Sequence, residues 1–257
     1  MRFGRSWIAA PAAFAVLLVG LAGPSRADHA DPKAVEIIDK AVKALGGEEK
    51  LSQVQAATWS SDGKLIINGA DNPFKTRVTF QGDDRMHLDF EGEFNGNSVK
   101  GTTVLNGDKA WRNINDNVQV LDADAIAREK RTLYLMTTPA LPGRLKGEGY
   151  KATVDGEQKV DDKPAAVLKV VGPDGKDFRL FFDKESGLPV KLVAQVSGWR
   201  GEDFEQETLF TDYKDYGGVK RPGKVVSKRD GEPFAEQSSV DFKIEKDLPA
   251  STFEEPK

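Results

Sequence analysis

The chain has 257 residues, of which 37 are basic and 41 acidic, and its formal net charge is −4 at pH 7. The charges are spread along the whole sequence, which argues against a nucleic-acid partner because phosphate binding needs a concentrated basic face. There is no cysteine, so no disulfide can stabilise the fold and no lipid can be attached through a thiol.

The first residues are arranged like a secretory signal peptide. Two arginines precede an apolar run from Trp7 to Gly23, and the small residue Ala27 follows. We therefore predict a signal peptide over residues 1–27 and a periplasmic or secreted protein. A membrane anchor is the alternative, but the run is shorter than the roughly 20 residues that a spanning helix needs. The remainder, residues 28–257, is long enough for a single large domain.

A helix is predicted at the start of this domain. Asp31 can cap it, Pro32 suits the first helical position, and Gly46 or Gly47 can end it. Its apolar stripe consists of Val35, Ile38, Val42 and Leu45. This spacing predicts one face packed against a core or a groove.

From about residue 56 onward, the sequence alternates apolar and polar residues with a period of two, as in half-buried strands. Short turn signals interrupt it every 8 to 15 residues or so, which favours antiparallel hairpins. These signals are Gly82-Asp83, Asn95-Gly96, Asn106-Gly107-Asp108, Asn115-Asp116-Asn117, Asp155-Gly156, Asp174-Gly175, Ser186-Gly187, Gly217-Gly218 and Asp230-Gly231. In the later strands the predicted apolar face of the sheet includes Val190, Leu192, Ala194 and Val196, and also Val240, Phe242 and Ile244.

A second helix is predicted at residues 122–137, where Pro139 and Pro142 then stop it. Each helix covers a strip about 10 Å wide, whereas about ten strands span nearly 50 Å when flat. The sheet must therefore curl around the helices. We predict a mainly β (α+β) fold, a curled antiparallel half-barrel of about ten strands with covering helices in its concavity.

Four stretches carry a family resemblance: "ALGGEEKL" (44–51), "FRLFFDKESGLPVKL" (178–192), "LFTDYKDYGGVKRPGKV" (209–225) and "DLPASTFEEP" (247–256). In these stretches and in the order of its elements, the chain resembles the periplasmic lipoprotein-sorting proteins, the superfamily of the carrier LolA, the outer-membrane acceptor LolB and the sensor RseB. The resemblance implies a half-barrel whose apolar concave surface receives acyl chains, with helices as a lid and no cofactor. It also implies an arginine that ties the lid shut, for which Arg85 is the candidate. The missing cysteine excludes a lipid-anchored acceptor.

We predict a ligand cavity lined by apolar side chains of the strands and of the second helix. The candidate lining residues are Phe80, Met86, Leu88, Phe90, Trp111, Leu133, Met136, Phe178, Leu180, Phe182, Leu192 and Phe242. The alternative for each is ordinary core packing, which is the default for alternating aromatic residues in strands. The segment 137–149, rich in proline and glycine, is either a mobile lid beside the cavity or a rigid spacer.

The residues offer little for catalysis. The two histidines, His29 and His87, with no cysteine, do not supply the three or four ligands of a zinc or copper site. A Gly-x-Ser-x-Gly elbow and a phosphate-binding glycine loop are both missing. A glycosidase remains open only because acidic residues are abundant.

We therefore predict an exported, soluble, non-catalytic protein without metal or cofactor. It would bind lipid acyl chains or a lipidated protein during lipoprotein or lipid transport toward the outer membrane, with a membrane protein complex as a further partner. One alternative is a regulatory binding module that senses envelope stress, as RseB does. The other is a hydrolase of cell-envelope polymer.

Overall fold

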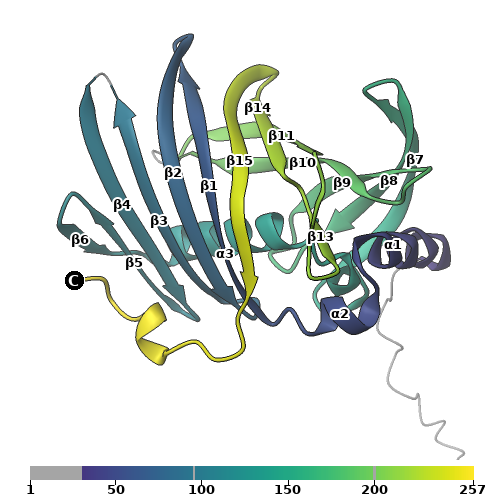
Figure 1. Ribbon diagram of the computed structural model, residues 1–257, viewed down its shortest axis with the longest axis horizontal. Coiled ribbons are helices and arrows are strands. Elements are labelled where there is room, and N and C mark those ends of the chain that lie inside the picture. Colours follow the sequence, from purple (N-terminus) through teal and green to yellow (C-terminus); the bar gives the residue numbers. More distant parts are fainter. Residues whose placement is uncertain (1–30, 95, 199–200) are drawn as a thin grey trace, which may run out of the picture.

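The computed structural model describes residues 31–94, 96–198 and 201–257 (Figure 1). The predicted signal peptide and His29 lie outside the described residues. Within the described part of the chain, no helix has the length and apolar character needed to cross a membrane.

About half of the described residues form one antiparallel sheet of thirteen strands, in the order β6-β5-β4-β3-β2-β1-β15-β14-β11-β10-β9-β8-β7. A separate hairpin pairs β12 with β13. The strands are β1 (Ala56–Ile67), β2 (Ala70–Gln81), β3 (Arg85–Phe94), β4 (Asn97–Asn106), β5 (Lys109–Ile114), β6 (Asn117–Val120), β7 (Lys151–Val160), β8 (Lys163–Val171), β9 (Asp177–Asp183), β10 (Pro189–Ser197), β11 (Asp203–Thr211), β12 (Lys214–Tyr216), β13 (Val219–Arg221), β14 (Lys224–Arg229) and β15 (Glu232–Ile244).

Three α-helices and two 3₁₀ turns make up the other regular elements of the described residues. They are α1 (Pro32–Leu45), α2 (Glu48–Ser52), α3 (Ala123–Thr137), η1 (Pro142–Lys146) and η2 (Ala250–Phe253). The sheet bends so that its two arms enclose a hollow, and α3 lies in it behind β1 and β15 (Figure 1). The predicted mainly β, curled half-barrel is confirmed, with more strands than the ten expected.

The first helix packs as its sequence pattern predicts. Asp31 caps α1 by accepting a hydrogen bond from the backbone N–H of Lys33 at 2.9 Å. Ile38, Val42 and Leu45 are buried in the main hydrophobic cluster. The helix contacts β7, β13 and η1, so it closes one end of the hollow instead of lying along it.

Four β-bulges or irregularities interrupt the register of the described strands, and three of them correct predictions from the sequence. Between β1 and β15 the register shifts, so Ser61 pairs with Ser239, and the extra residue Val240 is 58% exposed. A second shift next to Pro189 places Val190 against a small cluster on the outer face of β8–β10. The expectation that Val190 and Val240 share the core face with their neighbours is therefore wrong, because a bulge inserts one residue into the alternation.

The third bulge corrects a predicted turn. Asp155-Gly156 lies inside β7, where the register with β8 shifts between Val154 and Glu157. Gly156 has a φ of 90°, which suits the unpaired position of a bulge. The actual turn between β7 and β8 contains Asp161 and Asp162, both at positive φ.

The segment after α3 is packed against the core. Leu141 and Leu145 are buried, and Nη1 of Arg144 lies 2.7 Å from Oδ1 of Asp83. The Arg144 guanidinium also lies over the ring of Phe80, 5.6 Å from its centroid. These contacts favour a spacer over a lid.

Candidate functional site

An apolar pocket lies in the hollow between α3 and the strands. Its volume is about 170 Å³, similar to an engineered cavity of about 150 Å³ that binds benzene. Most of its lining side chains are apolar: Trp59, Leu135, Met136, Pro139, Ala140, Leu192, Val196, Phe210, Pro222 and Val225. The others are Ser61, Gln206, Thr208, Arg221, Ser227, Gln237 and Ser239.

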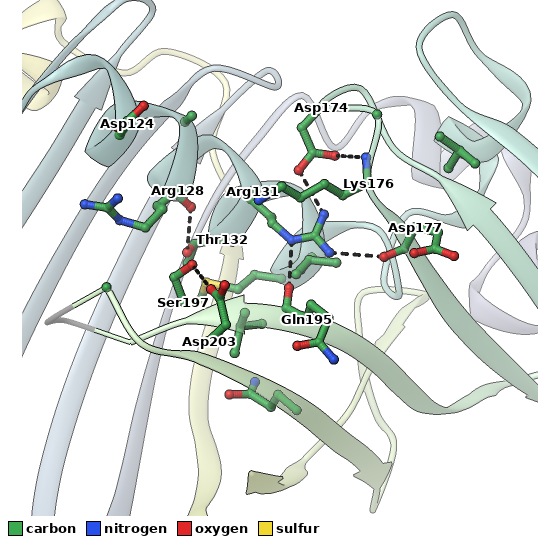
Figure 2. Close-up of a pocket in the computed structure, with 18 of the residues that line it drawn as sticks. Asp124, Arg128, Arg131, Thr132, Asp174, Lys176, Asp177, Gln195, Ser197 and Asp203 are labelled. Carbon is green, nitrogen blue, oxygen red and sulfur yellow. Dashed lines mark hydrogen bonds and ion pairs between the residues drawn. The ribbon is translucent and has the colours of Figure 1, made fainter. Parts of the chain in front are cut away.

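A larger polar vestibule adjoins the apolar pocket and has a volume of about 910 Å³. Figure 2 shows it between α3, the turn before β9, and the ends of β10 and β11. Its charged side chains are Asp124, Arg128, Arg131, Lys169, Asp174, Lys176, Asp177, Asp203 and Arg229. Both spaces are lined by Leu135, Met136, Val196 and Gln206. They therefore form one site with an apolar part and a polar part.

Arg131 joins α3 to the sheet at the edge of the vestibule (Figure 2). Its Nε donates a hydrogen bond to the Gln195 carbonyl oxygen at 2.9 Å, and its Nη2 donates to the Asp177 carbonyl oxygen at 3.1 Å. Its Nη1 donates to Oδ2 of Asp174 at 2.9 Å and also contacts the hydroxyl of Tyr134. The side chain of Arg131 is only 7% exposed. The helix is thus fixed to β9 and β10 through one buried side chain.

Two carboxylates of the vestibule are paired with cations, Asp174 with Arg131 and Asp177 with Lys169. Burial alone would raise the pKa of Asp174, but hydrogen bonds from Tyr134, Lys176 and Arg131 hold that pKa below its ordinary value. The neighbouring Asp177 also has a lowered pKa because of its hydrogen bond with Lys169, whose Nζ lies 2.9 Å away. Both carboxylates are therefore ionised and matched by cations at neutral pH. Such a surface suits solvent or a polar head group.

The hairpin of β12 and β13 brings a further arginine to the apolar pocket. Gly217 and Gly218 form its turn at φ values of 69° and 90°, as a two-residue hairpin turn requires. A side chain at Gly46, which ends α1, would overlap the Gly218 carbonyl, so the helix end abuts this turn closely. Val219 and Arg221 are two residues apart in β13 and both lie on its buried face, with 2% and 9% of their surface exposed.

Arg221 lies over two aromatic rings of the sheet. Its guanidinium carbon is 4.7 Å from the centroid of the Trp59 ring and 4.5 Å from that of Phe242. Trp59 and Phe242 are paired neighbours on β1 and β15. Burial lowers the pKa of Arg221 to about 10, so the side chain stays charged at neutral pH.

The twelve predicted lining residues lie in several different environments in the structure. Met136 and Leu192 line the apolar pocket. Six are buried in the main hydrophobic cluster: Phe80, Met86, Leu133, Phe178, Leu180 and Phe182. Leu88 and Phe242 are half-buried against that cluster. Phe90, in the second half of β3, stacks between two other rings. Its centroid lies 5.6 Å from that of Phe74 and 6.1 Å from that of Phe94.

Trp111 lies on the outer face of the sheet. Met86, Leu105 and Ala110 are aligned across β3, β4 and β5 and belong to the main cluster. The adjacent row, one residue along each strand, faces the other way and contains His87, Val104 and Trp111. Trp111 is therefore on the side of the sheet away from the apolar pocket.

Several lining residues were not predicted from the sequence, among them Trp59, Leu135, Phe210, Arg221 and Val225. A weak signal existed for Arg221, because it follows the buried Val219 by two residues and so shares its face. The predicted lid arginine, Arg85, is exposed and donates to Oε1 of Gln81 at 3.3 Å. Among the residues that the structure describes, no group of three or more metal-binding side chains is close enough to hold an ion.

Comparison with known proteins identifies the fold. No family model matches the sequence, and no curated protein matches it either. Among solved structures, a LolA superfamily protein from Nitrosomonas europaea is similar with a TM-score of 0.57 at 14% identity, over 86% of this chain and 97% of that one. A domain from Vibrio parahaemolyticus, assigned as an outer membrane lipoprotein-sorting protein, reaches a TM-score of 0.54 at 13% identity, over 86% and 96%.

A DUF1329 family protein from Desulfovibrio piger is similar to the same degree, with a TM-score of 0.53 at 14% identity, over 86% of this chain and 97% of that one. These similarities extend over nearly the whole described chain. The chain therefore has the LolA-like fold, as the resemblance of its sequence phrases implied.

Proposed function

We propose that this protein binds the acyl chain of a lipid, or of a lipidated protein, and shields it from water as an exported, non-catalytic carrier. The observation that carries the proposal is the apolar pocket under α3, which adjoins a polar vestibule. The apolar side chains of the pocket can enclose part of a chain, and the polar side chains in its lining and in the vestibule can meet a head group. The LolA-like fold supports the proposal, because one solved structure with this fold is assigned to lipoprotein sorting.

The size of the pocket sets how much of a chain it can take. A volume of about 170 Å³ admits only a short apolar segment, so the rest of a long chain would lie along the vestibule or displace flexible side chains such as Met136. Burying six methylene groups would contribute about 5 kcal/mol before the costs of association. Tight binding therefore needs contacts in both parts of the site.

The carboxylates of the vestibule argue against the hydrolase alternative. A glycosidase needs one carboxylic acid whose pKa is raised, so that it can donate a proton at neutral pH. Asp174 and Asp177 instead have lowered pKa values, and each is paired with a cation. Of the two other vestibule carboxylates, Asp203 accepts a hydrogen bond at Oδ1 from the Ser197 hydroxyl at 2.6 Å, and Asp124 lies in the first turn of α3.

We propose a single domain over residues 28–257, with residues 1–27 as an export signal.

The test is binding of the neutral fluorescent probe N-phenyl-1-naphthylamine, and its displacement by 1-dodecanol. We expect the wild-type protein to bind the probe and Val196→Trp to weaken binding at least tenfold, because Val196 lies where the pocket meets the vestibule. Val240→Trp is the matched control, since Val240 is exposed outside the site. A folded wild-type protein that binds neither probe nor amphiphile would overturn the proposal and favour a regulatory module.

A further inference from the structure

We propose that the ligand is an anionic amphiphile whose negative group meets the Arg221 guanidinium inside the apolar pocket. This inference rests on the proposed function. It adds the charge of the ligand and the residue that recognises this charge. The vestibule carries charges of both signs, with five basic and four acidic side chains in its lining, whereas the only charged side chain in the described lining of the apolar pocket is a cation.

The first observation is the burial of Arg221 without an opposite charge. Only 9% of its surface is exposed. Among the described residues, no hydrogen bond or ion pair of its side chain is found, and its contacts are with the rings of Trp59 and Phe242. The lining of the apolar pocket contains no aspartate or glutamate from the described part of the chain. Arg221 is therefore the single formal charge in that lining.

The second step is energetic. Removing an unpaired ion from water carries a large free-energy cost in a protein interior. Cation–π contacts with two rings offset only part of this cost. A bound anion would supply the missing partner, and its own burial would be compensated by the same charge. Arg131 provides the contrast, because each nitrogen of its guanidinium donates at least one hydrogen bond, to Asp174, to Tyr134 or to a carbonyl oxygen.

The surroundings of Arg221 define the class of anion. The guanidinium presents a planar set of N–H donors that matches a carboxylate or a phosphate. Ser61, Gln237 and Ser239 line the same pocket and offer further hydrogen-bond donors. The ionisable groups that face Arg221 are the phenols of Tyr213 and Tyr216, and burial raises the pKa of Tyr213 above its ordinary value. A fatty-acid carboxylate and a lipid phosphate share the required chemistry.

The experiment compares ligands that have the same chain and different heads. Dodecanoate, dodecyl phosphate and 1-dodecanol are each used at pH 7.5 to displace N-phenyl-1-naphthylamine, the two anions below their micelle concentrations and the alcohol below its solubility limit. We expect at least one of the two anions to displace the probe at a tenfold lower concentration than the alcohol. The stronger anion identifies whether the natural source is a free acid or a phosphate. In Arg221→Met the preference should disappear, while the alcohol still displaces the probe.

Arg144→Met is the matched control, because Arg144 also lies over an aromatic ring but outside the site. We expect it to keep the preference for anions. A second measurement needs no variant: dodecanoate, but not 1-dodecanol, should shift the NMR signal of the Arg221 Nε–H in the wild-type protein. Equal displacement by anions and alcohol, or a preference that survives Arg221→Met, would refute this inference alone. Failure of every amphiphile to bind would instead refute the proposed function.

Discussion

Nη1 of Arg131 lies 2.9 Å from Oδ2 of Asp174, across the gap between α3 and the turn that precedes β9. Forty-three positions separate the two residues in sequence. The sequence resemblance pointed to an arginine at the start of a strand as the residue that holds the lid. In the structure, an arginine on the helix itself makes the connection to the sheet.

Removing this connection should destabilise the protein. Arg131→Met leaves the partly buried Asp174 carboxylate and two carbonyl oxygens without their donor, so we expect the free energy of unfolding to fall by about 3 kcal/mol. Urea titration followed by circular dichroism measures the change. Arg85→Met serves as the control and should change stability by less than about 0.5 kcal/mol, because Arg85 is exposed. Equal effects of the two substitutions would contradict this role for Arg131.

Position 187 requires glycine for two reasons, its backbone conformation and the closeness of Lys40. It lies in the turn between β9 and β10 at a φ of 77°, and an added Cβ would come within 2.9 Å of Cγ and 3.2 Å of the carbonyl oxygen of Lys40 on α1. Gly175 has a similar φ of 75° with nothing within 4 Å of such a Cβ. We expect Gly175→Ala to cost about 1 kcal/mol for the left-handed backbone alone, and Gly187→Ala to cost more in thermal unfolding.

The C-terminal segment should be held by a pH-dependent contact. The ring of His87 places Nδ1 2.8 Å from the carbonyl oxygen of Thr252 and Nε2 3.1 Å from Oδ1 of Asp89. The hydrogen bond with Asp89 is the main reason that the pKa of His87 is raised above 6.5. A doubly protonated ring can donate both bonds, whereas the neutral ring can donate only one.

A raised pKa in the folded state stabilises the fold most at low pH. The contribution of His87 should be complete below about pH 6.5, the unfolded value, and should disappear as the pH rises through the higher folded value. Between pH 6 and 8, hydrogen exchange of the backbone amides at 250–254 should therefore become faster by a larger factor in the wild type than in His87→Gln. If the exchange rates of His87→Gln and of the wild type depend on pH in the same way, the ring proton of His87 does not hold the segment.

Arg221 should behave in the opposite way to Arg131 in the ligand-free protein. Its burial lowers its pKa, which means that the folded state disfavours its charge. We expect Arg221→Met to leave the free energy of unfolding unchanged or to raise it by about 1 kcal/mol, since an apolar side chain of similar length avoids the desolvation of an unpaired ion. A loss of more than about 2 kcal/mol in urea titration would mean that the charge is already compensated.

The sequence by itself determined the elements and the class of fold. The stripe of α1, the positions of most turns, and the alternation of Phe178, Leu180 and Phe182 follow from local periods of 3.6 and 2, which neighbouring residues impose on each other. The half-barrel followed from counting two helices against many strands, because too little helix was available to cover a flat sheet.

Only the tertiary structure decided which residues face the site. An alternating pattern shows that every second residue shares a face, but it does not show which face points inward. Trp111 was therefore predicted to line the cavity, although its row of residues lies on the outer face of the sheet. Bulges at Val190 and Val240 reversed the alternation without leaving a clear mark in the sequence, because they depend on pairing with distant strands. Arg221 reaches Trp59 and Phe242 through a three-residue strand, and no local pattern predicts contacts over such sequence distances.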